Sequence, residues 1–167
     1  LVPSIAILGL VYMFVQSRWV KAQSTGDDRM VEIARHIHEG ALAFLSAEYR
    51  ILAIFVVVAG ALLGLVSFLV QSTHWFIVIA FVIGAVFSAL AGNIGMRIAT
   101  EANVRTTQAA RTSLAQALKV SFTGGMVMGL GVAGLAVFGL SVLFIIFLNY
   151  FAEGEWQGVE KMTMILE

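Results

Sequence analysis

The sequence predicts an all-α protein with four membrane-spanning helices, and two observations carry the prediction. Hydrophobic residues make up 60% of the 167-residue chain and charged residues only 12%, with a mean hydropathy of +0.95. Soluble domains are closer to half apolar and a quarter charged. The apolar residues also gather into four long runs. Such continuous runs are too uniform for the alternating strands of a membrane barrel, so helices are the remaining solution.

We expect these membrane helices at residues 3–16, 51–70, 75–98 and 120–151. The second run holds no charged residue, and about 20 residues at 1.5 Å each cross the roughly 30 Å hydrocarbon core of a bilayer. The fourth run is the longest and must tilt or extend past the bilayer. The chain starts inside an apolar run at Leu1, and Met162–Leu166 begins another near its end. We therefore expect residues 1–167 to be the amino-terminal part of a longer chain.

The two long connections have structure of their own. In residues 24–49, apolar side chains recur every three or four residues, and charged side chains fill the other face. The apolar positions are Met30, Ile33, Ile37, Ala41 and Phe44. This spacing predicts an amphipathic helix that leads into the second membrane helix, with Ser24–Asp28 as a turn that caps it. Residues 99–119 are expected to extend the third and fourth helices beyond the membrane.

The charges predict an orientation and exclude some functions. Nine of the ten basic residues lie between the first and second apolar runs or between the third and fourth, or at the adjoining ends of those runs: Arg18, Lys21, Arg29, Arg35, Arg50, Arg97, Arg105, Arg111 and Lys119. The positive-inside rule makes that side cytoplasmic and places both chain ends outside. A net charge of zero argues against a nucleic-acid partner, which would need a basic face. The absence of cysteine excludes thiolate chemistry and cysteine-ligated metals.

Glycine motifs favour helix packing over ligand binding. Residues 129–134 spell G-x-G-x-x-G, but a dinucleotide site needs a preceding strand, and these glycines lie inside one unbroken apolar run. Gly60 with Gly64 and Gly125 with Gly129 form G-x-x-x-G pairs, and Ser88 with Gly92 has the same spacing. Small residues four apart allow close helix approach. Packing within the chain is our interpretation, and a dimer interface is the alternative.

Ionisable residues suggest no site. His36 and His38 are two apart, so on a helix they point in different directions, and Glu32 with His36 supplies only two ligands. A solvated helix face is the expected role. Arg97 and Glu101 have the spacing of a helical ion pair. The apolar runs, with the third counted from Trp75 to Ile94, contain no charged residue, whereas ion pathways usually do. These helices are therefore expected to be scaffold rather than conduit.

Several segments of the sequence resemble one protein family. They are Gly95-Met-Arg97, Ala102-Asn-Val-Arg-Thr106, Gly124-Gly-Met-Val-Met-Gly-Leu130, and the amphipathic segment Met30–Arg50 with its Ile-Ala, Gly-Ala and Phe-Leu pairs. In this order and spacing they resemble the amino-terminal helices of the membrane-bound, ion-pumping pyrophosphatases. One departure is Glu101, where the family more often has a basic or neutral residue.

The resemblance implies a homodimer with about sixteen membrane helices per full-length chain, each long enough to cross the bilayer. The reaction it implies is hydrolysis of pyrophosphate to two phosphates on the cytoplasmic side, coupled to pumping of H⁺ or Na⁺ across a bacterial plasma membrane or an acidic organelle membrane. It also implies Mg²⁺ as cofactor and leaves K⁺ open.

No residue of this segment matches the aspartate-rich motifs of the family, since its only aspartates, Asp27 and Asp28, lie in a loop. The resemblance therefore assigns no catalytic, cofactor-binding or metal-binding residue here, and it implies an outer-ring scaffold role. Two other classes stay open. One is a non-enzymatic four-helix membrane module for assembly or interaction. The other is a small-molecule transporter, which would need a membrane-embedded acid.

Overall fold

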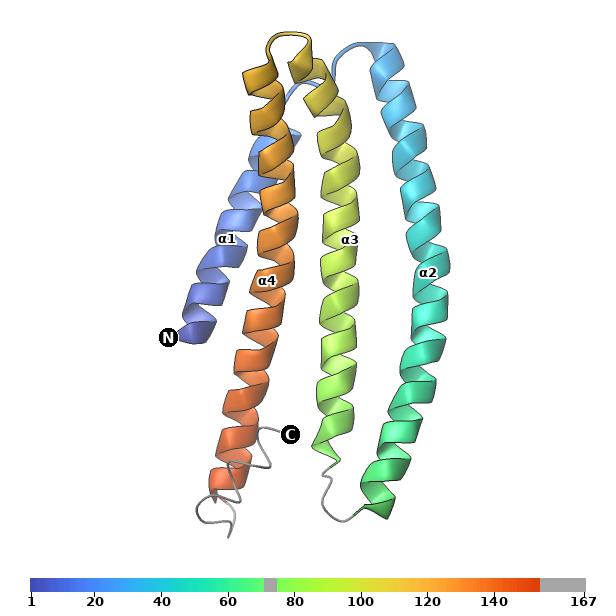
Figure 1. The fold of residues 1–167 in the computed structure, drawn as a ribbon, viewed down its shortest axis with the longest axis vertical. Coiled ribbons are helices and arrows are strands. Elements are labelled where there is room, and N and C mark those ends of the chain that lie inside the picture. Colours follow the sequence, from blue (N-terminus) through green and yellow to red (C-terminus); the bar gives the residue numbers. More distant parts are fainter. Residues whose placement is uncertain (71–74, 154–167) are drawn as a thin grey trace.

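The computed structural model describes residues 1–70 and 75–153, and these residues form four helices joined by short connections (Figure 1). The helices are α1 (Val2–Lys21), α2 (Asp28–Leu69), α3 (Phe76–Ala110) and α4 (Leu114–Glu153). All four are long and apolar enough to cross a membrane. The all-α, four-span prediction is confirmed.

The helices run further than the apolar runs that predicted them. The amphipathic residues and the apolar residues after them form one continuous α2 of 42 residues, about 63 Å long at 1.5 Å per residue. Likewise α1 continues to Lys21, and α3 continues to Ala110 before a turn at residues 111–113 leads into α4. A helix needs only its own backbone hydrogen bonds to continue, so it can leave the apolar layer without ending.

The turn before α2 has a specific chemistry. Asp27 is the N-cap of α2, and its Oδ1 accepts a hydrogen bond from the Met30 backbone N–H at 3.0 Å. Gly26 adopts a φ of +85°, a left-handed conformation that side-chain-bearing residues rarely take. A Cβ at Gly26 would also lie 2.5 Å from the Met30 sulfur. The capping turn expected around Ser24–Asp28 is therefore present.

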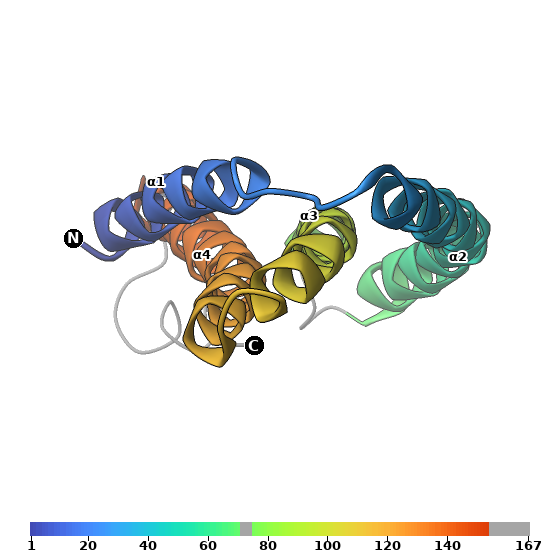
Figure 2. The same cartoon turned by 90° about the horizontal axis from the view of Figure 1, so that it is seen from above.

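The helices stand in an open, curved row rather than a closed bundle (Figure 2). Their order in space is α1, α4, α3, α2, so α4 packs against both α1 and α3, while α2 packs against α3 alone. Although α1 and α2 are consecutive in the sequence, they make no direct packing contact in the described part of the chain. Residues 22–27 bridge the gap between them, passing the end of α3.

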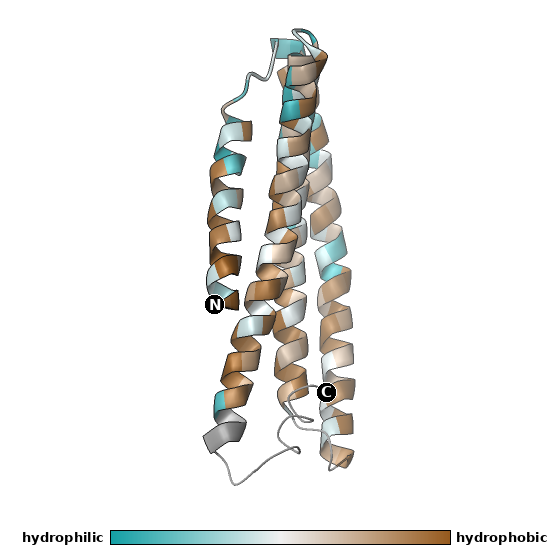
Figure 3. Cartoon of the chain, turned by 60° about the vertical axis from the view of Figure 1, so that its left-hand side comes forward, coloured by the Kyte–Doolittle hydropathy of each residue, from teal (hydrophilic) through white to brown (hydrophobic). Residues whose placement is uncertain are grey.

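The core lies where α1, α3 and α4 meet. It is formed by Val20, Ile98, Ala102 and Val127, with Met13 and Trp19 packed against it. Two of these residues, Val20 and Val127, have no exposed surface. Hydrophilic residues gather toward one end of the helices, the end at which the α3–α4 turn lies (Figure 3). We call this the basic end, because Lys21, Arg105 and Arg111 lie there.

Glycines allow the close approach of α4 to its neighbours. A Cβ added at Gly124 would lie 2.8 Å from the Ala102 Cβ, and one at Gly134 would lie 2.7 Å from a Leu10 methyl carbon. Gly139 faces the Phe87 ring in the same way, at 2.5 Å. These contacts leave no space for a side chain, so glycine sets the distance between the helices.

The glycine pairs singled out by spacing behave differently. A Cβ at Gly60, Gly125 or Gly129 would meet nothing within 4 Å among the described residues, and one at Gly64 would reach only a methyl group of Val78 at 3.9 Å. The expected packing within the chain is therefore not found at Gly60, Gly125 and Gly129. Their rotational position on α2 and α4 turns them away from the neighbouring helices.

The amphipathic face of α2 is also only partly buried. Leu45 is buried and Met30 half-buried, whereas Ile33, Ile37 and Phe44 are exposed. The spacing correctly predicted an amphipathic helix, but α3 covers a different part of its surface. The contact runs through His38 and Tyr49, whose hydroxyl donates to the Ala89 carbonyl at 2.6 Å.

Candidate functional site

A set of polar contacts at the basic end joins helices that are distant in the sequence. An Arg111 Nη1 nitrogen donates to Asp27 Oδ2 at 2.9 Å, linking the α3–α4 turn to the start of α2. The hydrogen bond from the Met30 backbone, together with the nearby Arg111 guanidinium, holds the pKa of Asp27 below its ordinary value of 3.8. Asp27 is thus both a helix cap and one half of an ion pair.

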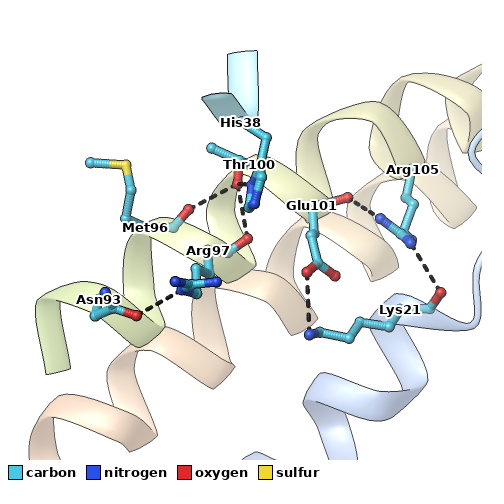
Figure 4. A network of polar contacts seen from close by, with 8 residues as sticks. All are labelled: Lys21, His38, Asn93, Met96, Arg97, Thr100, Glu101 and Arg105. Atoms are coloured by element: carbon cyan, nitrogen blue, oxygen red, sulfur yellow. Dashed lines mark hydrogen bonds and ion pairs between the residues drawn. The ribbon is translucent and has the colours of Figure 1, made fainter. Parts of the chain in front are cut away.

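A second contact fixes the end of α1 (Figure 4). Lys21 Nζ lies 3.2 Å from Glu101 Oε1 on α3. One turn further along α3, Arg105 donates from Nη1 to the Glu101 carbonyl at 2.8 Å and from Nη2 to the Lys21 carbonyl at 3.1 Å. The last carbonyls of a helix have no partner within it, so Arg105 satisfies one of them from a neighbouring helix.

The expected pair between Arg97 and Glu101 is not formed. Arg97 Nε instead donates to Asn93 Oδ1 at 2.8 Å, on the turn before it, and Glu101 turns toward Lys21. The packing of α3 beside the end of α1 explains this choice of partner. Arg97 is exposed, whereas the Glu101 side chain is 26% exposed beside the end of α1, where a lysine is available. A long-range partner has therefore replaced the local one.

His38 has a role that the sequence did not predict. Its Nδ1 lies 2.9 Å from Oγ1 of Thr100, which is a buried residue of α3. The Thr100 hydroxyl has one hydrogen, which it donates to a backbone carbonyl of its own helix, that of Met96 or Arg97. It therefore accepts from His38, which places the imidazole hydrogen on Nδ1. The expectation of a solvated face is wrong for His38, which is half-buried, and correct for the exposed His36 beside Glu39.

These contacts position helices but bring no reactive groups together. Within residues 1–70 and 75–153, no three histidine, aspartate or glutamate side chains lie close enough to hold a metal ion. Asp27 already accepts from Met30 and Arg111, and Glu101 is paired with Lys21. A further contact, Lys119 Nζ 5.2 Å from the centre of the Trp19 ring, again joins α4 to α1. The arrangement is a clamp on helix ends.

The sequence predicts none of the long-range contacts of this clamp. Asp27 was singled out as part of a capping turn, which is the signal that located it. Nothing in the spacing of Arg105 or Arg111 pointed to α1 or α2, because their partners are 84 residues away. The density of arginine in the second connection was the only available signal.

Comparison with known proteins places these helices in context. Residues 7–166 match the family model of the inorganic H⁺ pyrophosphatases. The chain is 44% identical over 135 residues to a K⁺-stimulated pyrophosphate-energized sodium pump of Thermotoga maritima, covering 80% of this chain and 17% of that protein. It is 39% identical over 147 residues to K⁺-insensitive pyrophosphate-energized proton pump 2 of Moorella thermoacetica, covering 88% of this chain and 21% of that protein.

A third relative, from Clostridium tetani, carries the name of a putative K⁺-stimulated pyrophosphate-energized sodium pump. It is 43% identical over 124 residues, which are 74% of this chain and 18% of that protein. The chain thus spans about a fifth of the length of the curated relatives it matches. Relatives named as sodium pumps and as a proton pump match to a similar degree, so this segment does not separate the two.

Proposed function

The chain belongs to the inorganic H⁺ pyrophosphatase family, and we propose that its full-length protein hydrolyses pyrophosphate and uses the energy to pump H⁺ or Na⁺ across a membrane. The observation that carries the proposal is the family match over residues 7–166, supported by relatives named as pyrophosphate-energized pumps. Four helices able to cross a bilayer make the chain an integral membrane protein, as such a pump requires.

Within that pump, residues 1–167 serve as an outer-ring scaffold. The support is physical. Polar contacts at the basic end lock helix ends, and glycines such as Gly124 and Gly134 fit helix against helix. The described residues also do not fit an Mg²⁺ site, because their carboxylates form no cluster. We place Mg²⁺, the catalytic residues, the ion gate and any response to K⁺ in other parts of the full-length chain.

The basic end faces the cytoplasm in this proposal, with the full-length protein as a homodimer in a bacterial plasma membrane or an acidic organelle membrane. The support for the orientation is the distribution of charge, since nine of the ten basic residues lie between the first and second or between the third and fourth apolar runs, on the side of the basic end.

The test is pyrophosphate-driven ion movement in inverted vesicles from cells expressing the full-length gene, with vesicles lacking the gene as control. Acidification that persists with a sodium ionophore identifies a proton pump. Sodium uptake that the ionophore abolishes identifies a sodium pump. If the vesicles show no ion movement and no Mg²⁺-dependent phosphate release, the proposal fails, and a non-enzymatic assembly module takes its place.

The scaffold role has its own test in the same protein. Gly124→Leu places a large side chain against Ala102, so the amount of folded pump should fall while the turnover of each folded molecule stays near wild type. A catalytic position would give the opposite pattern, with normal yield and lost turnover. That pattern at Gly124 would contradict the scaffold assignment.

A further inference from the structure

One apolar surface of α2 has no partner among the described residues. We call it the outer stripe, and it consists of Ile33, Ile37 and Phe44, which are 52%, 47% and 58% exposed. Their spacing of four and seven residues places them on one side of a helix with 3.6 residues per turn. A Cβ at Gly40, between them, would also meet nothing within 4 Å.

The outer stripe is distinct from the two other faces of α2. The face that meets α3 carries His38, Leu45 and Tyr49. The polar face carries Arg35 and Glu39, which pair with each other at 3.3 Å with both side chains more than half exposed. The apolar arc of α2 is therefore wider than the surface that α3 covers, and the outer stripe is the uncovered part.

Lipid cannot cover most of this stripe. The uncharged run of α2 begins at Ile51, and from there to Leu69 it is about as long as the hydrocarbon core is thick. Phe44 lies about 10 Å along the helix from Ile51, and Ile33 about 27 Å, at 1.5 Å per residue. Three large apolar side chains in a row thus extend beyond the bilayer, where exposure to water costs roughly 25 cal/mol per Å².

The outer stripe alone is too small to form a stable interface with a second copy of the chain. A stable interface between separate proteins buries about 800 Å² on each partner, and three half-exposed side chains supply only a fraction of that. A segment of the same polypeptide needs less surface, because it is already held at a high effective concentration. The curated relatives are long enough to supply one, since this chain spans only about a fifth of them.

We propose that the outer stripe is the docking site for a helix of the same polypeptide, contributed by the part of the full-length chain outside residues 1–167. The inference rests on the proposed function only in taking the full-length protein to be as long as its relatives. The docked helix presents apolar side chains at three- and four-residue spacing. Gly40 lets the two backbones approach closely, as small residues do at helix interfaces.

The first experiment measures protection of single cysteines in the full-length protein, held in lipid nanodiscs so that both membrane sides are accessible. Residues 1–167 contain no cysteine, and any elsewhere would be replaced by serine. Ile33→Cys and Ile37→Cys should react with a bulky water-soluble maleimide at least tenfold more slowly than Arg35→Cys, the control on the polar face of the same helix. Equal rates at all three positions would overturn the proposal.

The second experiment identifies the occupant. A photo-crosslinking residue, benzoylphenylalanine, replaces Ile37 in the full-length protein, with the same replacement at Arg35 as control. The expected product runs as a monomer on a denaturing gel and contains a peptide from outside residues 1–167. A product of twice the monomer mass would identify a second copy and overturn the choice of occupant, as would cross-links to lipid alone.

Neither readout depends on catalysis. Pyrophosphate hydrolysis is assayed on the same nanodisc samples, so protected cysteines without hydrolysis would uphold the docking surface and count against the pump. Hydrolysis with unprotected cysteines would do the reverse.

Discussion

The Lys21 ammonium lies 3.2 Å from the Glu101 carboxylate, so the last residue of α1 is tied to α3 by an ion pair. The neighbouring Arg105 strengthens the tie, because it donates to the carbonyl of the same lysine. Two groups of one short segment of α3 thus hold the end of α1 while its side chains pack against α4. The position of α1 depends on both neighbours.

We expect a small but measurable coupling between Lys21 and Glu101. The lysine side chain is 52% exposed, so solvent screens the pair, and the coupling should be at most about 1 kcal/mol and weaken with salt. A double-mutant cycle with Lys21→Met and Glu101→Gln, read from unfolding midpoints in detergent micelles, measures it. The control cycle replaces Lys21→Met with Arg97→Gln and should give no coupling. A larger coupling energy in the control cycle would show that Glu101 pairs with Arg97 rather than with Lys21, and would contradict the prediction.

Alanine substitutions at two adjacent glycines of α4 should have different effects on the stability of the protein. The added methyl of Gly124→Ala meets the Ala102 Cβ at 2.8 Å, an overpacking that costs about 1–3 kcal/mol. The same methyl in Gly125→Ala meets nothing within 4 Å in this segment, and the higher helix propensity of alanine should leave stability unchanged or raised by up to about 1 kcal/mol. Thermal unfolding of the purified full-length protein compares the two. Equal losses would contradict the observed rotation of α4.

Removing the Thr100 hydroxyl should loosen α2 from α3. Thr100→Val keeps the shape of the side chain but leaves the Nδ1–H of His38 without its acceptor, at a cost of about 1–3 kcal/mol. Thr100→Ser, which keeps the hydroxyl, is the matched control and should remain closer to wild type. The measurement is the unfolding midpoint of each variant. Identical midpoints for valine and serine would show that the hydrogen bond contributes nothing.

The link between Asp27 and Arg111 should depend on pH. Because the folded state holds the pKa of Asp27 below 3.8, the stabilisation is complete above that value and is lost as pH falls through the depressed pKa. Asp27→Asn keeps a good N-cap but removes the charge, so it should be less stable than wild type at neutral pH. The two proteins should converge once the pH is below the depressed pKa of Asp27, where the carboxyl of the wild type is protonated. A constant difference in unfolding midpoint across this range would contradict the prediction.

The number and kind of elements could be predicted from the sequence because lipid leaves few options. A long uncharged run such as Ile51–Val70 must satisfy its own backbone hydrogen bonds, and a helix does so. Local spacing also predicted that residues 28–49 form an amphipathic helix, since backbone periodicity alone decides that. These predictions do not require knowing which helices pack against one another.

Neighbour relations required the structure. Gly124 and Gly125 are identical and adjacent, yet about 100° of helix rotation buries one against Ala102 and leaves the other open. Glu101 has a suitable local partner in Arg97 and pairs with Lys21 instead. In both cases the contact depends on which helix packs against the residue. The spacing of residues within a single helix does not contain that information.

The pairing of α1 with α4 has a consequence for biogenesis. Leu10 and Gly134 touch, yet the ribosome makes the first long before the second, a delay on the order of 10 s at usual synthesis rates. During that time α1 lacks α4, the helix against which it packs most extensively, and its apolar surface must be shielded by lipid or by the insertion machinery. The α3–α4 hairpin, joined by a three-residue turn, closes through local contacts and so assembles first. Of α1, α3 and α4, the helix that is synthesised first, α1, is therefore the last to pack.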